Sequence, residues 1–194
     1  SGDFRPIDHS ALDLDLLRRV ADVPGLSGFE DAAQALVAEE LAKHADEVWR
    51  DRMGNVIALR KARKKGSGPT RKVLYAAHAD EIGAVVSHVD EEGFIRFRAV
   101  GGLDPRTLPS QRVVIHATKD GERQVKGVIA AQSGWLGEDE DRQRVFPVKE
   151  LYIDVGLPGS VVKRQVHVGD AITFASTFDV LNDDVVVGRN FDDR

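Results

Sequence analysis

The first quarter of the chain carries apolar residues at helical spacing. Between residues 10 and 23 they recur every three or four positions, at Leu12, Leu16, Leu17 and Val20. This spacing predicts a helix with one apolar face. Pro24 and Gly25 follow directly, and both residue types end helices.

A second helix is expected just after this stop. Ser27 and Glu30 have the spacing of a capping box, in which each side chain accepts a hydrogen bond from a free backbone N–H at the helix start. The apolar positions that follow predict one buried face and a helix end near Ala45. The residues expected on that face are Ala33, Leu36, Val37 and Leu41.

Beyond residue 46 the pattern changes to short strands. The runs 47–52 and 55–60 flank Met53-Gly54 and predict a hairpin. The continuous apolar run 73–77 is typical of a central strand that a sheet buries on both faces. Six more strand runs follow with hardly any helix between them, which predicts an antiparallel barrel or sandwich. They lie at 82–89, 94–100, 112–118, 124–131, 151–155 and 171–178.

Composition narrows the classes of function. The 194 residues include 27 Lys and Arg against 32 Asp and Glu, a formal net charge of −5. A mildly acidic chain has no general attraction to nucleic acid or anionic lipid, so neither is expected as a partner. The chain has no cysteine, which excludes disulfides and thiolate zinc sites and leaves His, Asp and Glu to hold any metal. No apolar run approaches the roughly 20 residues that span a bilayer, and we expect a cytoplasmic protein.

His78 and Asp80 are the sharpest chemical feature of the sequence. They follow the apolar run 73–77, and the ends of buried strands are the usual ligand side of open α/β sheets. Two residues apart in an extended chain, their side chains project to the same side. A neutral imidazole can bind a metal ion while a nearby carboxylate orients it. Taken alone, such a pair more often marks a histidine in an ordinary hydrogen bond at a strand end than a metal ligand.

A second candidate lies at residues 188–194. Asp192 and Asp193 are adjacent carboxylates after the Val-rich strand predicted at 185–187. One carboxylate can bridge two divalent ions about 3.5–4 Å apart, with one oxygen on each. The alternative is a surface turn in which Asp193 pairs with Arg194.

In their joint order these motifs resemble the M42 family of metallo-aminopeptidases, which includes glutamyl, leucyl and deblocking enzymes and members labelled endoglucanase M. The resemblance covers essentially the whole chain. One departure is Ala79, where many relatives have Met between the His and the Asp. The segments that carry the resemblance include GLSGFE (25–30), DRMGNVI (51–57), AHADEIG (77–83), VGGLDPRT (100–107) and GRNFDDR (188–194).

The resemblance implies an α/β fold: the front portion of a metallo-exopeptidase catalytic domain, interrupted by an antiparallel β-barrel-like insertion. Residues 1–81 and 181–194 would form the incomplete catalytic domain, and residues 82–180 the insertion, through which family members oligomerise, from dimers to dodecamers. Motif by motif, it implies His78 as a metal ligand, Asp80 as the catalytic carboxylate that orients the site, and Asp192 as the carboxylate that bridges the metals.

The implied activity is removal of N-terminal residues from peptides with two divalent metal ions, zinc or cobalt. The family also needs a Glu-Glu pair, a further Asp and a His downstream of residues 192–194. We therefore expect this 194-residue chain to be inactive alone. The alternatives are a non-catalytic fragment or paralogue whose β domain serves assembly or peptide binding, and a protein of the endoglucanase label. Glycoside hydrolysis normally uses two carboxylates flanking the sugar bond, which a His-x-Asp pattern does not favour.

Overall fold

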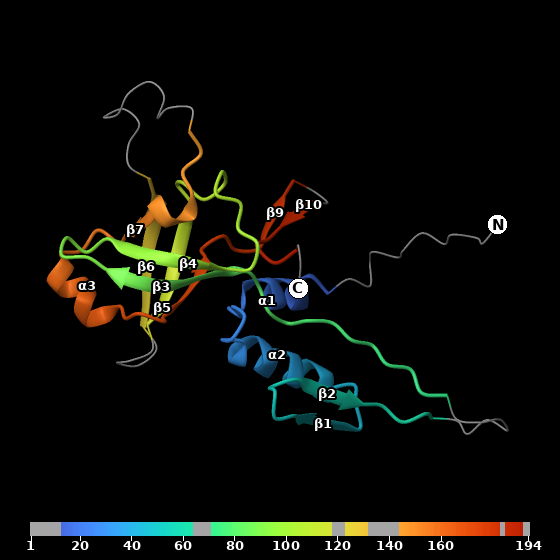
Figure 1. Ribbon diagram of the computed structural model, residues 1–194. Helices are drawn as coiled ribbons and strands as arrows, with labels where there is room; N and C mark the ends of the chain where they lie inside the picture. Colours follow the sequence, from blue (N-terminus) through green and yellow to red (C-terminus); the bar gives the residue numbers. More distant parts are fainter. Residues whose placement is uncertain (1–12, 64–70, 118–122, 132–143, 183–184, 192–194) are drawn as a thin grey trace.

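The computed structural model describes residues 13–63, 71–117, 123–131, 144–182 and 185–191 (Figure 1). The described chain has two parts: a closed β-barrel, and a smaller region of two helices and a hairpin beside it. Within the described ranges, no helix has the length and apolar character needed to cross a membrane. The α/β architecture interrupted by a β-barrel that the sequence predicts is confirmed.

The helical region begins with α1 (Leu14–Asp22) and α2 (Asp31–Ala42). Asp13 caps α1, since its carboxylate accepts a hydrogen bond from the Leu16 N–H at 2.9 Å. The antiparallel hairpin of β1 (Glu47–Arg50) and β2 (Val56–Leu59) packs against α2 and confirms the hairpin predicted around Met53-Gly54. Of the four residues predicted for the buried face of α2, Ala33 alone is fully buried.

The barrel closes in the strand order β3-β4-β7-β6-β5-β8, with every neighbouring pair antiparallel. Closure leaves no unpaired sheet edge, which is how small β proteins avoid edge-to-edge association. Each of the six strand runs predicted from the sequence contributes one strand. They are β3 (Gly83–Val89), β4 (Ile95–Val100), β5 (Arg112–Ala117), β6 (Arg123–Ala130), β7 (Tyr152–Asp154) and β8 (Ala171–Phe174).

The hydrophobic core fills the inside of this barrel. Ile95, Ile115 and Ile153 from three different strands are fully buried at its centre. On β6 the side chains alternate between buried and exposed, as a barrel wall requires. The helix α3 (Gly159–Gln165) adds Val162, one turn before the buried Val166, to the same core.

The sequence did not predict α3, which follows Pro158 and covers one end of the barrel (Figure 1). Two other short elements were also missed. One is the 3-10 turn η3 (Val148–Glu150). The other is β9 (Asp179–Leu181), which pairs with β10 (Val185–Val187) outside the barrel, near α1.

The predicted capping box at the start of α2 is wrong. The helix begins one turn later than that motif requires, with Glu30 itself at the N-cap position. The Glu30 carboxylate turns back and accepts from the Gly28 N–H at 2.7 Å. The Ser27 hydroxyl donates to the carboxylate of Asp80, 53 residues away in the chain. A long-range partner for Ser27 therefore replaces the local one.

The predicted buried strand at residues 73–77 is also wrong. This segment is extended but pairs with no strand among the described residues, and it runs from the hairpin side back to the barrel (Figure 1). Val73, Leu74 and Tyr75 are 74%, 88% and 91% exposed. A strand buried on both faces needs a neighbouring strand on each edge and cover above and below. The described part of the chain supplies neither to this segment.

Gly83, at the start of the barrel, has no room for a side chain. A Cβ built there would lie 2.5 Å from the Ile172 carbonyl oxygen and 2.8 Å from Leu26 Cδ1. We expect Gly83→Ala to lower the free energy of unfolding by about 1–3 kcal/mol, the usual cost of overpacking, measured by urea denaturation. Gly102→Ala is the matched control, because a Cβ there meets nothing within 4 Å. Equal stability of the two variants would contradict the packing at Gly83.

Candidate metal-binding site

His78, Asp80 and Ser27 form a chain of hydrogen bonds just before the barrel begins. The Nδ1 atom of His78 lies 3.0 Å from Oδ1 of Asp80, and the Ser27 hydroxyl donates to Oδ2 of the same carboxylate. The side chain of His78 is half exposed, and that of Asp80 is about one-third exposed. The structure therefore brings together the two residues that the sequence paired, and it adds a serine that sequence reasoning missed.

The carboxylate of Asp80 is held in its ionised form. The Ser27 hydroxyl, and after it His78, keep the pKa of Asp80 below its ordinary value, because both stabilise the charged form. An ionised Asp80 requires the proton of a neutral His78 ring to sit on Nδ1, which donates to it. Nε2 then carries the lone pair, which is the form in which imidazole binds a metal ion. The geometry suits a histidine ligand oriented by a carboxylate.

The next residue, Glu81, anchors this segment to the body of the protein. One oxygen of Glu81 accepts from the Gly25 N–H at 2.8 Å, and the other lies 2.9 Å from Nε of Arg189. The same guanidinium donates to the carbonyl oxygens of Phe174, at 3.0 Å, and Asp22, at 2.8 Å. We call these five residues the Arg189 junction.

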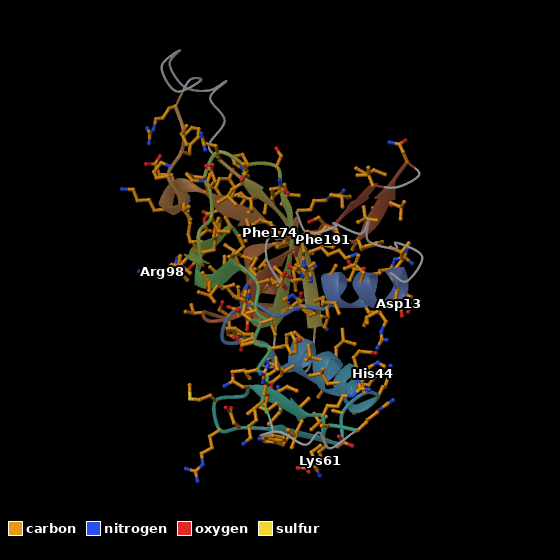
Figure 2. All side chains as sticks on the ribbon, turned by 90° about the vertical axis from the view of Figure 1, so that its right-hand side faces the viewer. Asp13, His44, Lys61, Arg98, Phe174 and Phe191 are labelled. Carbon is orange, nitrogen blue, oxygen red and sulfur yellow. The ribbon has the colours of Figure 1, made fainter. Side chains whose placement is uncertain are left out.

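The Arg189 junction joins the end of α1, the start of the barrel and the end of the barrel. Phe174, labelled in Figure 2, is the last residue of the barrel strand β8, and Arg189 binds its carbonyl oxygen. Asn190 adds a buried bond from its amide nitrogen to the Ala21 carbonyl oxygen at 2.7 Å. Sequence reasoning passed over Glu81 and Arg189, because two charges 108 residues apart carry no local signal of pairing.

Asp192, the third predicted site residue, lies outside the described residues, as does Asp193. The described chain continues to Phe191, whose ring packs edge-on against Phe178. Across the described ranges, no group of three or more His, Asp and Glu side chains is arranged to hold a metal ion. The described part of the site is thus one oriented imidazole with its supporting carboxylate and serine.

A separate groove of about 820 Å³ runs along the outer face of β5, β6 and β8. His116 lines it, with Nε2 2.8 Å from the Thr173 hydroxyl, and its pKa is lowered first by burial and then by the charge of Arg189. The lining includes Arg112, Lys126 and Asp154 but neither His78 nor Asp80. Its floor is the outside of the barrel, so the groove is distinct from the His78 site.

Comparison with known proteins decides the family. The profile described as M42 glutamyl aminopeptidase matches residues 54–194, which is most of the chain. The chain belongs to the M42 family. The lysyl aminopeptidase of Pyrococcus furiosus is 34% identical over 187 residues, covering 94% of this chain and 51% of that protein.

Solved structures of M42 relatives share the fold. A TET aminopeptidase from the archaeon Thaumarchaeota archaeon SCGC AB-539-E09 superposes with a TM-score of 0.78 at 30% identity, covering 87% of this chain and 46% of that one. The TET1 peptidase of Pyrococcus horikoshii, which can assemble into a tetrahedron or a large octahedral shell, has a TM-score of 0.70 at 32% identity, covering 87% and 48%. A Thermotoga maritima protein described as an endoglucanase has a TM-score of 0.66 at 30% identity, covering 86% and 46%.

The M42 chain described here spans about half the length of the curated relatives it matches. The residues that the M42 profile matches include the His78–Asp80 pair, the barrel, and the ion pair of Glu81 with Arg189.

Removing the hydrogen bond from Ser27 should change the pKa at which Asp80 binds a proton. In Ser27→Ala, the pKa of Asp80 should rise toward its ordinary value of about 4, because the donor that stabilises the carboxylate is removed. The lowered pKa in the wild type adds stability that is present above the ordinary value and is lost as pH falls through the lowered pKa. The loss of stability at acid pH should therefore be smaller in the Ser27→Ala variant than in the wild type.

Carbon-detected NMR titration of the Asp80 carboxyl measures this shift. Ser160→Ala, at an exposed serine on α3, is the control and should leave the titration unchanged. An Asp80 titration identical in wild type and Ser27→Ala would show that the hydroxyl does not stabilise the carboxylate.

Proposed function

We propose that this M42 chain is the front portion of an aminopeptidase that uses two divalent metal ions to remove N-terminal residues from peptides. The observation that carries the proposal is the hydrogen-bond chain from Ser27 through Asp80 to Nδ1 of His78. A surface histidine needs no such support, whereas a metal ligand does, because its tautomer and ring orientation must be fixed. Aminopeptidase names among the relatives and the metal dependence of the M42 family agree with this function.

The residues of this chain have separate roles in the proposal. His78 is the metal ligand, Asp80 holds its ring and proton in place, and Ser27 keeps Asp80 ionised. Asp192 is proposed as the carboxylate that bridges the ions, by its place in the GRNFDDR motif. Divalent ions, when bound, supply Lewis acidity that polarises the scissile carbonyl. His, Asp and Glu ligands suit zinc and cobalt, the ions we propose.

The exposed apolar run at residues 73–77 supports the view that more of the catalytic domain packs here. Three neighbouring large side chains that are 74–91% exposed are unusual in a folded protein and mark a surface that another element covers. We propose that further residues of the complete protein cover this run. The same proposal implies two domains. Residues 1–81 and 181–194 would form the catalytic domain, and residues 82–180 would form the insertion. The 194-residue chain alone should then lack peptidase activity.

The Thermotoga maritima relative described as an endoglucanase does not change this choice. Glycoside hydrolysis uses a pair of carboxylates about 5–10 Å apart across the sugar bond. At the candidate site Asp80 is bound to His78 and Ser27, and its neighbour Glu81 is buried against Arg189. A histidine–carboxylate pair fits a metal site better than it fits a glycosidase.

Replacing the proposed ligand tests the function directly. In the complete gene product, His78→Ala should remove one of two bound divalent ions and most of the hydrolysis of aminoacyl-p-nitroanilides, because the imidazole ligand is lost. Asp80→Asn should lower metal affinity about 10–100-fold, the usual effect of removing a supporting carboxylate. Elemental analysis and steady-state kinetics measure both effects.

His44→Ala is the matched control, since His44 is exposed on the turn after α2 (Figure 2). It should retain both ions and full turnover. A His78→Ala protein with two ions and wild-type kinetics would overturn the assignment.

We also propose that the barrel mediates homo-oligomer formation. The support is the similarity to the Pyrococcus horikoshii TET1 peptidase, which assembles into closed shells. Sedimentation velocity of the complete gene product at micromolar concentration should show species larger than the monomer. A monomer at every concentration tested would rule out the proposed assembly.

A further inference from the structure

The ion pair between Glu81 and Arg189 is nearly closed to solvent. The two side chains are 5% and 9% exposed, and Nε and Oε2 are 2.9 Å apart. Removing two charges from water costs free energy that their attraction does not always repay, so a buried pair is weak evidence of a contribution to stability. Buried pairs of this kind can instead fix one arrangement of the segments that carry them.

Three further bonds of the pair go to the backbone of other segments. Glu81 accepts from the Gly25 N–H, and Arg189 donates to the carbonyl oxygens of Asp22 and Phe174. The guanidinium is a planar group with five N–H donors in a fixed fork, so its three partners also fix each other's positions. The pair therefore sets the relative placement of four stretches of chain, at residues 22–25, 81, 174 and 189.

Two of these stretches carry proposed metal ligands. Glu81 directly follows Asp80 and lies three residues after His78, and Arg189 lies three residues before Asp192. The Glu81 backbone is also held, because its N–H donates to the Gly25 carbonyl oxygen at 2.8 Å and its carbonyl oxygen accepts from the Ser27 N–H at 3.3 Å. Displacement of Arg189 would shift both stretches together.

We propose that Glu81 and Arg189 are positioning residues that hold the His78–Asp80 segment against residues 188–191 and so keep the His78 imidazole in the orientation that binds a metal ion. This inference rests on the proposed function. Neither residue is a proposed metal ligand. Their effect is exerted through the two stretches of backbone that they tie together.

The barrel has its own means of stability, which makes the proposal testable. Its hydrophobic core contains neither Glu81 nor Arg189. Its strands close through antiparallel pairs that involve neither residue, including β3 with β8. Changes in the Arg189 junction should therefore loosen the segments around it while the barrel remains folded.

The test uses Arg189→Lys and Glu81→Gln in the complete gene product. Lysine keeps the charge, but its single ammonium group cannot reach three acceptors in the fixed directions of a guanidinium. Glutamine keeps the shape of the side chain and removes its charge. Arg98→Met is the surface control, because Arg98 is exposed on β4, well away from Phe191 in Figure 2. Val86→Ala is the stability control, because it weakens the barrel core and leaves the Arg189 junction intact.

Three readouts are compared: divalent metal affinity by calorimetry, amide hydrogen exchange, and turnover as a function of metal concentration. Arg189→Lys and Glu81→Gln should each raise the metal Kd at least tenfold and speed exchange at residues 80–83 and 188–191. Exchange in β4, β5 and β6 should be unchanged. Excess metal should restore most of the lost turnover with little change in KM. Arg98→Met and Val86→Ala should keep the wild-type Kd.

Distinct results would overturn the inference. Faster exchange at residues 80–83 and 188–191 with an unchanged metal Kd would show that the pair does not set the metal site. Loss of the folded barrel in both variants would show a general structural role. If the wild-type protein binds no divalent ion, the proposed function itself fails, and the exchange data then show separately whether the pair holds the two segments.

Discussion

The buried contact between Arg189 and Glu81 is the constraint on which the arrangement of this protein depends. The chain leaves the helical region at Glu81, builds a barrel of six strands, and returns to the same place at Arg189. Removing one partner of a buried ion pair typically costs about 3–5 kcal/mol, because the other charge is left without compensation. The return of the chain to its point of departure is therefore enforced by a specific contact.

The two parts of the protein differ in how they are held together. The barrel buries a continuous core and has no free strand edge, so its fold follows from its own sequence. The helical region buries few large side chains, and Trp49 and Leu59 on its hairpin remain 45% and 43% exposed. Its placement relies on polar contacts, such as the bond from the Phe178 N–H to Asp22 at 2.7 Å and those of Arg189. This difference is expected if the barrel is a self-contained insertion and the helical region is a part of a larger domain.

Features that depend on residues close together in the sequence were predictable, and features that depend on contacts between distant residues were not. Strands and hairpins of the barrel were predictable, because alternation of apolar residues and turn signals are local properties. The pairing of His78 with Asp80 was predictable for the same reason. The run 73–77 was misjudged, because its apolar character indicates a buried strand but cannot say whether neighbouring strands are present. The three partners of Arg189 could not be predicted, because two of them are backbone carbonyl groups of distant segments.

Ser27 fits the local pattern of a helix cap, but in the structure its hydroxyl makes a long-range hydrogen bond instead. A serine three residues before a glutamate satisfies the pattern of a helix cap, which is worth about 1 kcal/mol. In the folded chain the parallel bridge between Leu26 and Glu81 brings the Ser27 hydroxyl to Asp80, and an ionised carboxylate is a stronger acceptor than a neutral one. Glu30 therefore stands at the N-cap position of α2, and its side chain makes no capping hydrogen bond to the helix. Helix α2 thus loses a cap while the candidate site gains a donor, and such a local conflict is typical of functional sites.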